Sequence, residues 1–123
     1  MITEDYVSFE TAKLLKEKGF EPPHDYRKCL PIMYTDNGEI KWGVWSDDWY
    51  PRITLQMAMK WLREVHNIAI NIGWGSVFEE YYRWWCVILD QKSGKILQDS
   101  EYYKTYEEAC EAAIKYCLEN LIQ

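Results

Sequence analysis

Histidine and cysteine side chains are the first candidates for metal or nucleophilic chemistry, and the chain holds two histidines and four cysteines. Metal motifs place their ligands three or four residues apart on a helix, or as two cysteines separated by two residues in a C-x-x-C turn. Neither His24 nor His66 has such a neighbour, and no two cysteines have C-x-x-C spacing. We therefore predict that the chain binds no metal.

A nucleophilic thiol paired with a distant histidine remains open, because such pairs form in space and not along the chain. Cys29 stands beside Arg27 and Lys28 and is the one thiol expected to be exposed and activated. The remaining thiols lie in apolar runs, where burial raises the pKa of a thiol and makes it inert; they are Cys86, Cys110 and Cys117.

Two adjacent acidic pairs, Asp47-Asp48 and Glu79-Glu80, are the candidates for acid–base work. Glycosidase carboxylates are held about 5–9.5 Å apart across a sugar, which neighbours in one loop rarely achieve. The pair Gly73 and Gly75 is followed by no lysine or helix start, as a phosphate loop would require. With no nucleophile, base and orienting group in one set, we predict a non-enzymatic protein without a cofactor.

Aromatic residues near turns are the feature that ordinary core filling explains least. The sequence has 7 Trp and 10 Tyr among 123 residues. Rings beside polar groups in loops are typical of contact surfaces. The predicted binding residues are Trp42, Trp45, Asp47, Asp48, Trp49, Tyr50 and Trp74. Three interpretations are open: the rings cap the end of a sheet, form a protein-binding surface, or stack on a sugar or a base.

Composition limits the class of partner. The net charge is −6, with 20 acidic against 14 basic residues, and no basic stripe appears. Because nucleic-acid affinity comes mainly from lysine and arginine on phosphates, a nucleic acid is a disfavoured partner. No apolar run approaches the ~20 residues of a membrane helix, and no signal peptide is recognisable. We expect a cytoplasmic protein with reduced thiols and no membrane contact.

Local patterns predict three helices and five strands. Ser8, Thr54 and Thr105 are good N-caps; they precede helices at residues 9–18, 55–66 and 106–121. Strands are predicted at residues 30–35, 39–45, 68–72, 81–89 and 95–98, with a tight turn at Asn37-Gly38 and another at residues 73–76. Residues 46–52 are predicted as a loop.

These elements predict an α+β fold of order α-β-β-α-β-β-β-α. We expect an antiparallel or mixed sheet with the helices packed mainly on one face, and strand 81–89 in its centre because it is apolar on both faces. The chain is predicted to be a single domain over residues 1–123, in which the N-terminal helix of residues 1–21 is peripheral.

Three segments resemble a group of small uncharacterised proteins encoded in gut Bacteroides-type genomes and their phages or mobile elements. They are VSFETAKLLKEKGF at residues 7–20, the TLQ, WLRE and HNI runs within residues 54–68, and the YEEA and AIK runs within residues 106–115. The resemblance implies a cytoplasmic protein in a phage or mobile-element context, and it implies no activity, cofactor or site residue.

The leading functional hypothesis is a small non-enzymatic protein that binds an unknown protein partner or a second copy of itself. One alternative is a carbohydrate- or small-ligand-binding module that uses the Trp-rich loop. The other is a phage-type inhibitor that offers an acidic face, including Glu108, Glu111 and Glu119, to a basic host protein.

Overall fold

The computed structural model describes residues 5–21, 32–43, 45–78, 81–99 and 102–122. Within them lie three helices and two three-stranded antiparallel sheets, which confirms the α+β class. The elements, in chain order, are α1 (Phe9–Glu17), β1 (Ile32–Tyr34), β2 (Ile40–Trp42), β3 (Tyr50–Pro51), α3 (Leu55–His66), β4 (Ile68–Phe78), β5 (Tyr81–Asp90), β6 (Ile96–Asp99) and α4 (Tyr106–Asn120).

The three helices begin at the caps that the sequence predicts. The side chains of Ser8, Thr54 and Thr105 each accept a hydrogen bond from a backbone N–H three residues on. Helix α3 has the predicted bounds and ends at Asn67, whose φ of 56° lies in the left-handed region. An asparagine tolerates this conformation better than most residues, so it closes the helix as a glycine would.

The first sheet has the strand order β2-β1-β3. The predicted tight turn at Asn37-Gly38 would need a positive φ at both residues. Within this turn Gly38 alone has one, and the connection between β1 and β2 is wider than predicted. The Gly38 N–H donates to the Thr35 carbonyl, and the Thr35 N–H donates to Glu39, as in a type I turn followed by a left-handed residue. Strand β3 was not predicted, since two residues are too few to show alternation.

The second sheet has the order β4-β5-β6, so β5 is central, as predicted. The turn predicted at residues 73–76 is wrong: β4 continues through it and pairs with β5 as far as Phe78. Gly73 faces Trp85 across the ladder, and a Cβ on Gly73 would lie 2.0 Å from Trp85 Cζ2. Position 73 is therefore a glycine because any larger residue would collide with the indole ring, and glycine is often found in strands for this reason.

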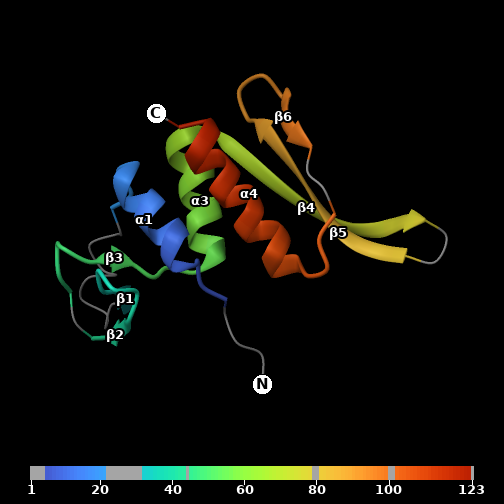
Figure 1. Cartoon of the computed structure of the whole chain (residues 1–123). Coiled ribbons are helices and arrows are strands. Elements are labelled where there is room, and N and C mark those ends of the chain that lie inside the picture. The colour runs from blue at the N-terminus through green and yellow to red at the C-terminus, as the bar shows by residue number, and fades with distance from the viewer. Residues whose placement is uncertain (1–4, 22–31, 44, 79–80, 100–101, 123) are drawn as a thin grey trace.

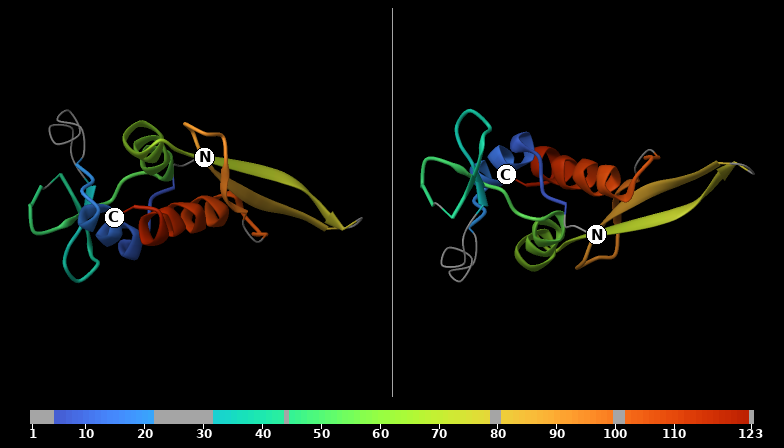
Figure 2. Two further views of the ribbon diagram at one scale, coloured as in Figure 1. Left: turned by 90° about the horizontal axis from the view of Figure 1, so that it is seen from above. Right: turned by 90° about the horizontal axis from the view of Figure 1, so that it is seen from below.

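One face of the second sheet is covered by helices. Ile68, Cys86 and Ile88 share that face by register and are buried in one core cluster with residues of α3 and α4. Figure 1 shows the β4–β5 hairpin continuing well beyond the helices, and the first sheet at the other end of the molecule. Two sheets with helices between them thus replace the one expected sheet. Figure 2 confirms from above and below that the hairpin projects.

Helix α1 packs on α4 and on β3, and its Ala12 and Leu15 belong to the same core cluster. A polar contact orients the two helices: Glu111 Oε1 of α4 accepts from Thr11 Oγ1 at 2.5 Å and from the Ser8 N–H at 3.1 Å. Beside it, Lys115 Nζ lies 3.0 Å from Glu10 Oε2. These contacts join α1 to the body of the described structure, while the prediction of one domain over residues 1–123 stays a prediction.

The two glycines of β4 give a matched test of the Trp85 contact. We expect Gly73→Ala to lower the free energy of unfolding by about 1–3 kcal/mol, because the new methyl group collides with the Trp85 ring. Gly75→Ala is the control, since its Cβ would lie 3.8 Å from Trp85 Nε1, an ordinary contact. Urea denaturation of both variants measures the difference, and equal stabilities would show that the ring can move aside.

Candidate functional site

Six of the seven predicted binding residues lie together around the first sheet. Trp42 is in β2 and Tyr50 is in β3; the segment between them carries Trp45, Asp47, Asp48 and Trp49. We call residues 45–50 the aromatic loop. Trp74 is instead in β4 of the second sheet, at the other end of the molecule (Figure 1). The structure therefore does not bring Trp74 together with the other six residues.

The aromatic loop is held against helix α1 by a lysine that the sequence analysis did not single out. Lys16 Nζ donates to the Asp47 carbonyl and, at 2.9 Å, to the Trp49 carbonyl. The same ammonium lies 5.1 Å from the centre of the Tyr50 ring, within cation–π range. Inside the loop, Trp45 Nε1 donates to Asp47 Oδ1 at 3.1 Å. These bonds give the loop a defined shape without any ligand.

A cavity of about 220 Å³ lies between the aromatic loop and the end of α1. Trp45 and Trp49 line it together with buried Met33 and Phe20. Asp47 also lines it and is exposed at the surface. Glu21 and Lys16 line it as well. Apolar rings with a few charged groups beside them match the usual composition of a small-molecule site, although the volume is below the usual range of about 300–1,000 Å³.

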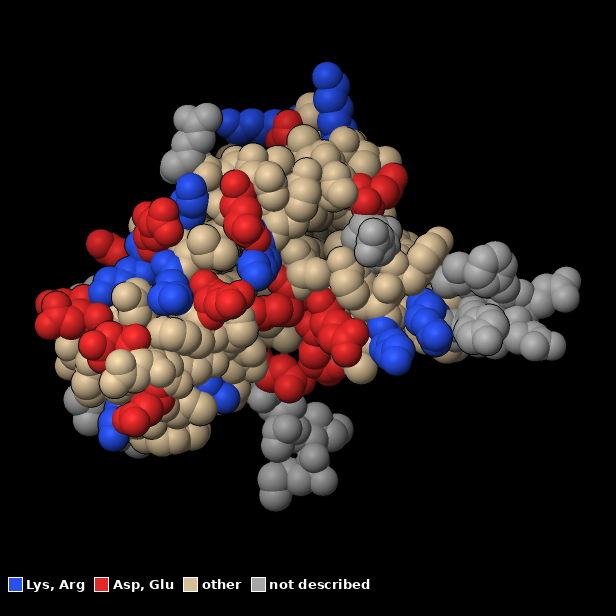
Figure 3. Space-filling model, in the orientation of Figure 1, with Lys and Arg blue, Asp and Glu red and all other residues tan. Residues whose placement is uncertain are grey.

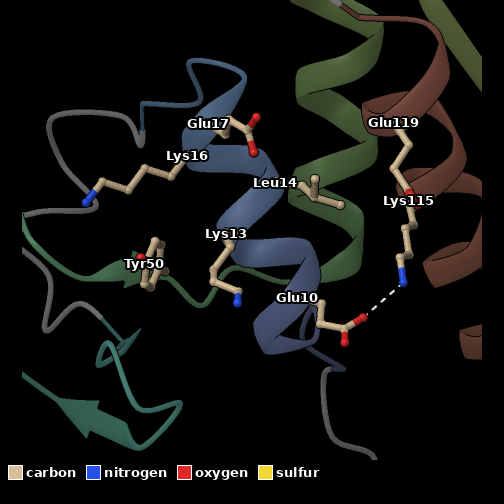
Figure 4. A pocket seen from close by; sticks show the side chains of 8 residues that line it. All are labelled: Glu10, Lys13, Leu14, Lys16, Glu17, Tyr50, Lys115 and Glu119. Carbon is tan, nitrogen blue, oxygen red and sulfur yellow. Dashed lines mark hydrogen bonds and ion pairs between the residues drawn. The ribbon is translucent and has the colours of Figure 1, made fainter.

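A second, more open hollow of about 680 Å³ lies along α1 and α4 (Figure 4). Its charges alternate, with Lys13 and Lys16 near Glu10 and Glu17. The hydrogen bond from Lys115 lowers the pKa of Glu10, and Glu10 in turn raises the pKa of Lys115. Because three lysines and three glutamates line it, the hollow shows no preference for a ligand of either charge.

The two most exposed tryptophans stand in different sheets. Trp42 is 65% exposed in β2, where Ile40 is exposed as well, and Trp74 is 57% exposed in β4. Trp74 begins a row of rings: its centre lies 6.5 Å from that of Trp84, which lies 5.3 Å from that of Tyr106. Gln56 donates to the Tyr106 hydroxyl at 2.8 Å and holds the inner end of this row.

The described thiols and imidazole are placed as inert groups. Cys86, Cys110 and Cys117 are buried, and desolvation raises the pKa of Cys110 to about 11 and that of Cys117 to about 12. Burial lowers the pKa of His66, whose ring packs edge-on against Trp61 with centres 4.7 Å apart. The remaining candidates, His24, Cys29 and the pair Glu79-Glu80, lie outside the described residues.

The described residues contain no group of three or more histidine, cysteine, aspartate and glutamate side chains that could hold a metal ion. None of their helices combines the length and the apolar character needed to cross a bilayer.

Comparison of the chain with protein-family models, curated proteins and solved structures gives no match. The resemblance to proteins of gut Bacteroides-type genomes therefore stays an expectation. What can be said of function depends on the geometry described above.

The role of Lys16 can be tested by removing its ammonium. In Lys16→Met, we expect the free energy of unfolding to fall by about 1 kcal/mol, below the usual worth of about 1.5–3 kcal/mol for a charged hydrogen bond because the site is partly solvated. We also expect acrylamide to quench tryptophan fluorescence more strongly as Trp45 and Trp49 loosen. Lys60→Met on the exposed side of α3 is the control; unchanged quenching in both variants would contradict the bracing role.

Proposed function

We propose that the chain is a non-enzymatic interaction protein that associates with a second copy of itself through the projecting part of the β4–β5 hairpin. We call this part the arm; it comprises residues 73–78 and 81–85. The observation that carries the proposal is the 57% exposure of Trp74 on the arm. An exposed tryptophan on a regular, well-paired strand is typical of a contact surface.

The strand pairing of the arm favours this interpretation. Strand β6 pairs only with Val87, Ile88 and Leu89, and an isolated bridge joins Trp84 to Tyr103. Beyond Trp84, the described arm therefore has two strands. A two-stranded ribbon is marginally stable in water, and a third strand or a packed face is normally required.

The free edge of β4 favours a second copy as the partner. Strand β4 is eleven residues long and lies at the edge of its sheet, so one side of its backbone is available for pairing. Two copies related by a two-fold axis could pair β4 antiparallel with β4, which gives each arm a third strand. On the uncovered face of the central strand β5, Trp85 and Leu89 lie outside the core cluster and add apolar surface next to β4.

The two most exposed tryptophans, Trp74 and Trp42, give a matched experiment. We expect size-exclusion chromatography with light scattering to give a mass of twice 14.8 kDa for the unaltered chain and 14.8 kDa for Trp74→Lys, because a lysine on an edge strand opposes pairing. Trp42→Lys in β2 is the control and should remain dimeric. Circular dichroism checks that both variants are folded.

Two results would contradict the proposal. If the unaltered chain has a monomeric mass at two protein concentrations that differ 100-fold, it does not self-associate and the proposal is wrong. Dissociation by Trp42→Lys with a dimeric Trp74→Lys would move the contact from the arm to the first sheet.

The cavity beside the aromatic loop favours a second candidate function, the binding of a small ring-shaped ligand such as a sugar or a heterocycle. Its support is the pair of half-buried rings, Trp45 and Trp49, around an apolar hollow with Asp47 at its edge. A thermal-shift screen of monosaccharides and aromatic metabolites tests it. We expect a ligand to raise the melting temperature of the unaltered chain and of Trp42→Ala, but not of Trp49→Ala; no stabilising ligand in the screen would count against this function.

A further inference from the structure

A groove of about 580 Å³ lies between the N-terminal segment and the first half of α4, and none of its lining residues belongs to the arm or to the aromatic loop. Its apolar lining includes Val7, Leu55 and Ala112. The rings of Tyr6, Tyr34 and Tyr103 also line it. Val7, Leu55 and Tyr34 are buried, so the accessible apolar part of the groove is Ala112 with the half-buried rings of Tyr6 and Tyr103.

Carboxylates surround this apolar lining. Asp5, Glu107, Glu108 and Glu111 line the groove, against one cation, Lys115. Lys115 is engaged by Glu10, and Glu111 is engaged by Ser8 and Thr11. In the described part of the chain, no lysine or arginine forms an ion pair with the three remaining acids. Figure 3 shows red atoms gathered over the start of α4 and the N-terminal segment.

The rings of the groove already accept a guanidinium group. The Arg52 guanidinium carbon lies 4.1 Å from the centre of the Tyr6 ring and 5.8 Å from that of Tyr34. Such rings attract cations through their negative faces, and arginine is the cation most often found there. The Tyr6 ring thus already carries a cation of this chain, and a further cationic side chain in the groove would pair with the carboxylates.

From this combination, we propose that the groove binds a lysine- and arginine-rich segment of another protein, with apolar side chains between its cations. The apolar lining would take the apolar side chains, and Asp5, Glu107 and Glu108 would pair with the cations. A nucleic acid or an anionic membrane would be repelled by these carboxylates. A second copy of this chain, with its net charge of −6, is a poor occupant, so this contact is independent of the proposed self-association.

Blocked nine-residue peptides are suitable probes. One peptide alternates arginine with leucine, and its counterpart has glutamate in place of arginine. Fluorescence anisotropy measures affinity, and amide chemical shifts of the protein locate the contact. We expect the arginine peptide to bind, with shifts at Val7, Glu107 and Ala112, and to weaken as salt is added. The glutamate peptide should not bind.

Charge variants separate a specific groove from general attraction. Glu107→Gln combined with Glu108→Gln should weaken the arginine peptide about five- to tenfold, as expected for two partly solvated ion pairs. The matched control combines Glu64→Gln on α3 with Glu119→Gln near the end of α4. It removes the same charge outside the groove and should change affinity less than twofold.

Because Glu107 and Glu108 lie in the first turn of α4, their replacement could disturb the helix itself. A further variant therefore leaves this turn unchanged. Ala112→Arg places a cation on the groove lining, half-buried in mid-helix, and should weaken binding at least as much with melting temperature little changed. The proposal is overturned by equal weakening in both glutamine pairs, by unperturbed groove amides, or by undiminished binding in Ala112→Arg.

Discussion

The carboxylate of Glu111 connects the two ends of the described structure. Thr11 is fully buried, and its hydroxyl tolerates burial because it donates a hydrogen bond to Glu111 Oε1 at 2.5 Å. The same oxygen accepts from the Ser8 N–H, which a helix start leaves without a partner inside the helix. Helix α1 is therefore seated on α4 in one orientation, and through Lys16 it carries the aromatic loop of the first sheet.

Local signals account for the parts of the fold that the sequence predicts well. Caps such as Thr54 and Asn67 act through hydrogen bonds within a few residues, so a single sequence reveals them. The errors fall where a distant residue decides. In the sequence alone, Gly73 indicates a turn, and only its contact with Trp85 shows why a strand has a glycine there. Strand β3 forms by pairing with β1, which its own two residues do not indicate.

The candidate sites show the same division between local and distant information. Trp45, Asp47 and Trp49 are close in sequence, and the structure places them around one cavity. Trp74 was grouped with them because it stood in the turn predicted at residues 73–76, but it lies within a strand of the other sheet. Glu108 and Glu111, expected on an acidic face, do line the groove, whereas the groove itself could not be predicted because its lining comes from four separate segments.

The burial of the two α4 thiols, Cys110 and Cys117, determines when this helix can be chemically modified. With a pKa of about 11, Cys110 is a thiolate in about one molecule in ten thousand at pH 7, whereas a solvated cysteine reaches about three in a hundred. Alkylating reagents and oxidants react with the thiolate. Because both thiols are also fully buried, a reagent reaches Cys110 or Cys117 only when α4 separates from the sheet, and the covalent adduct that then forms persists after the helix returns.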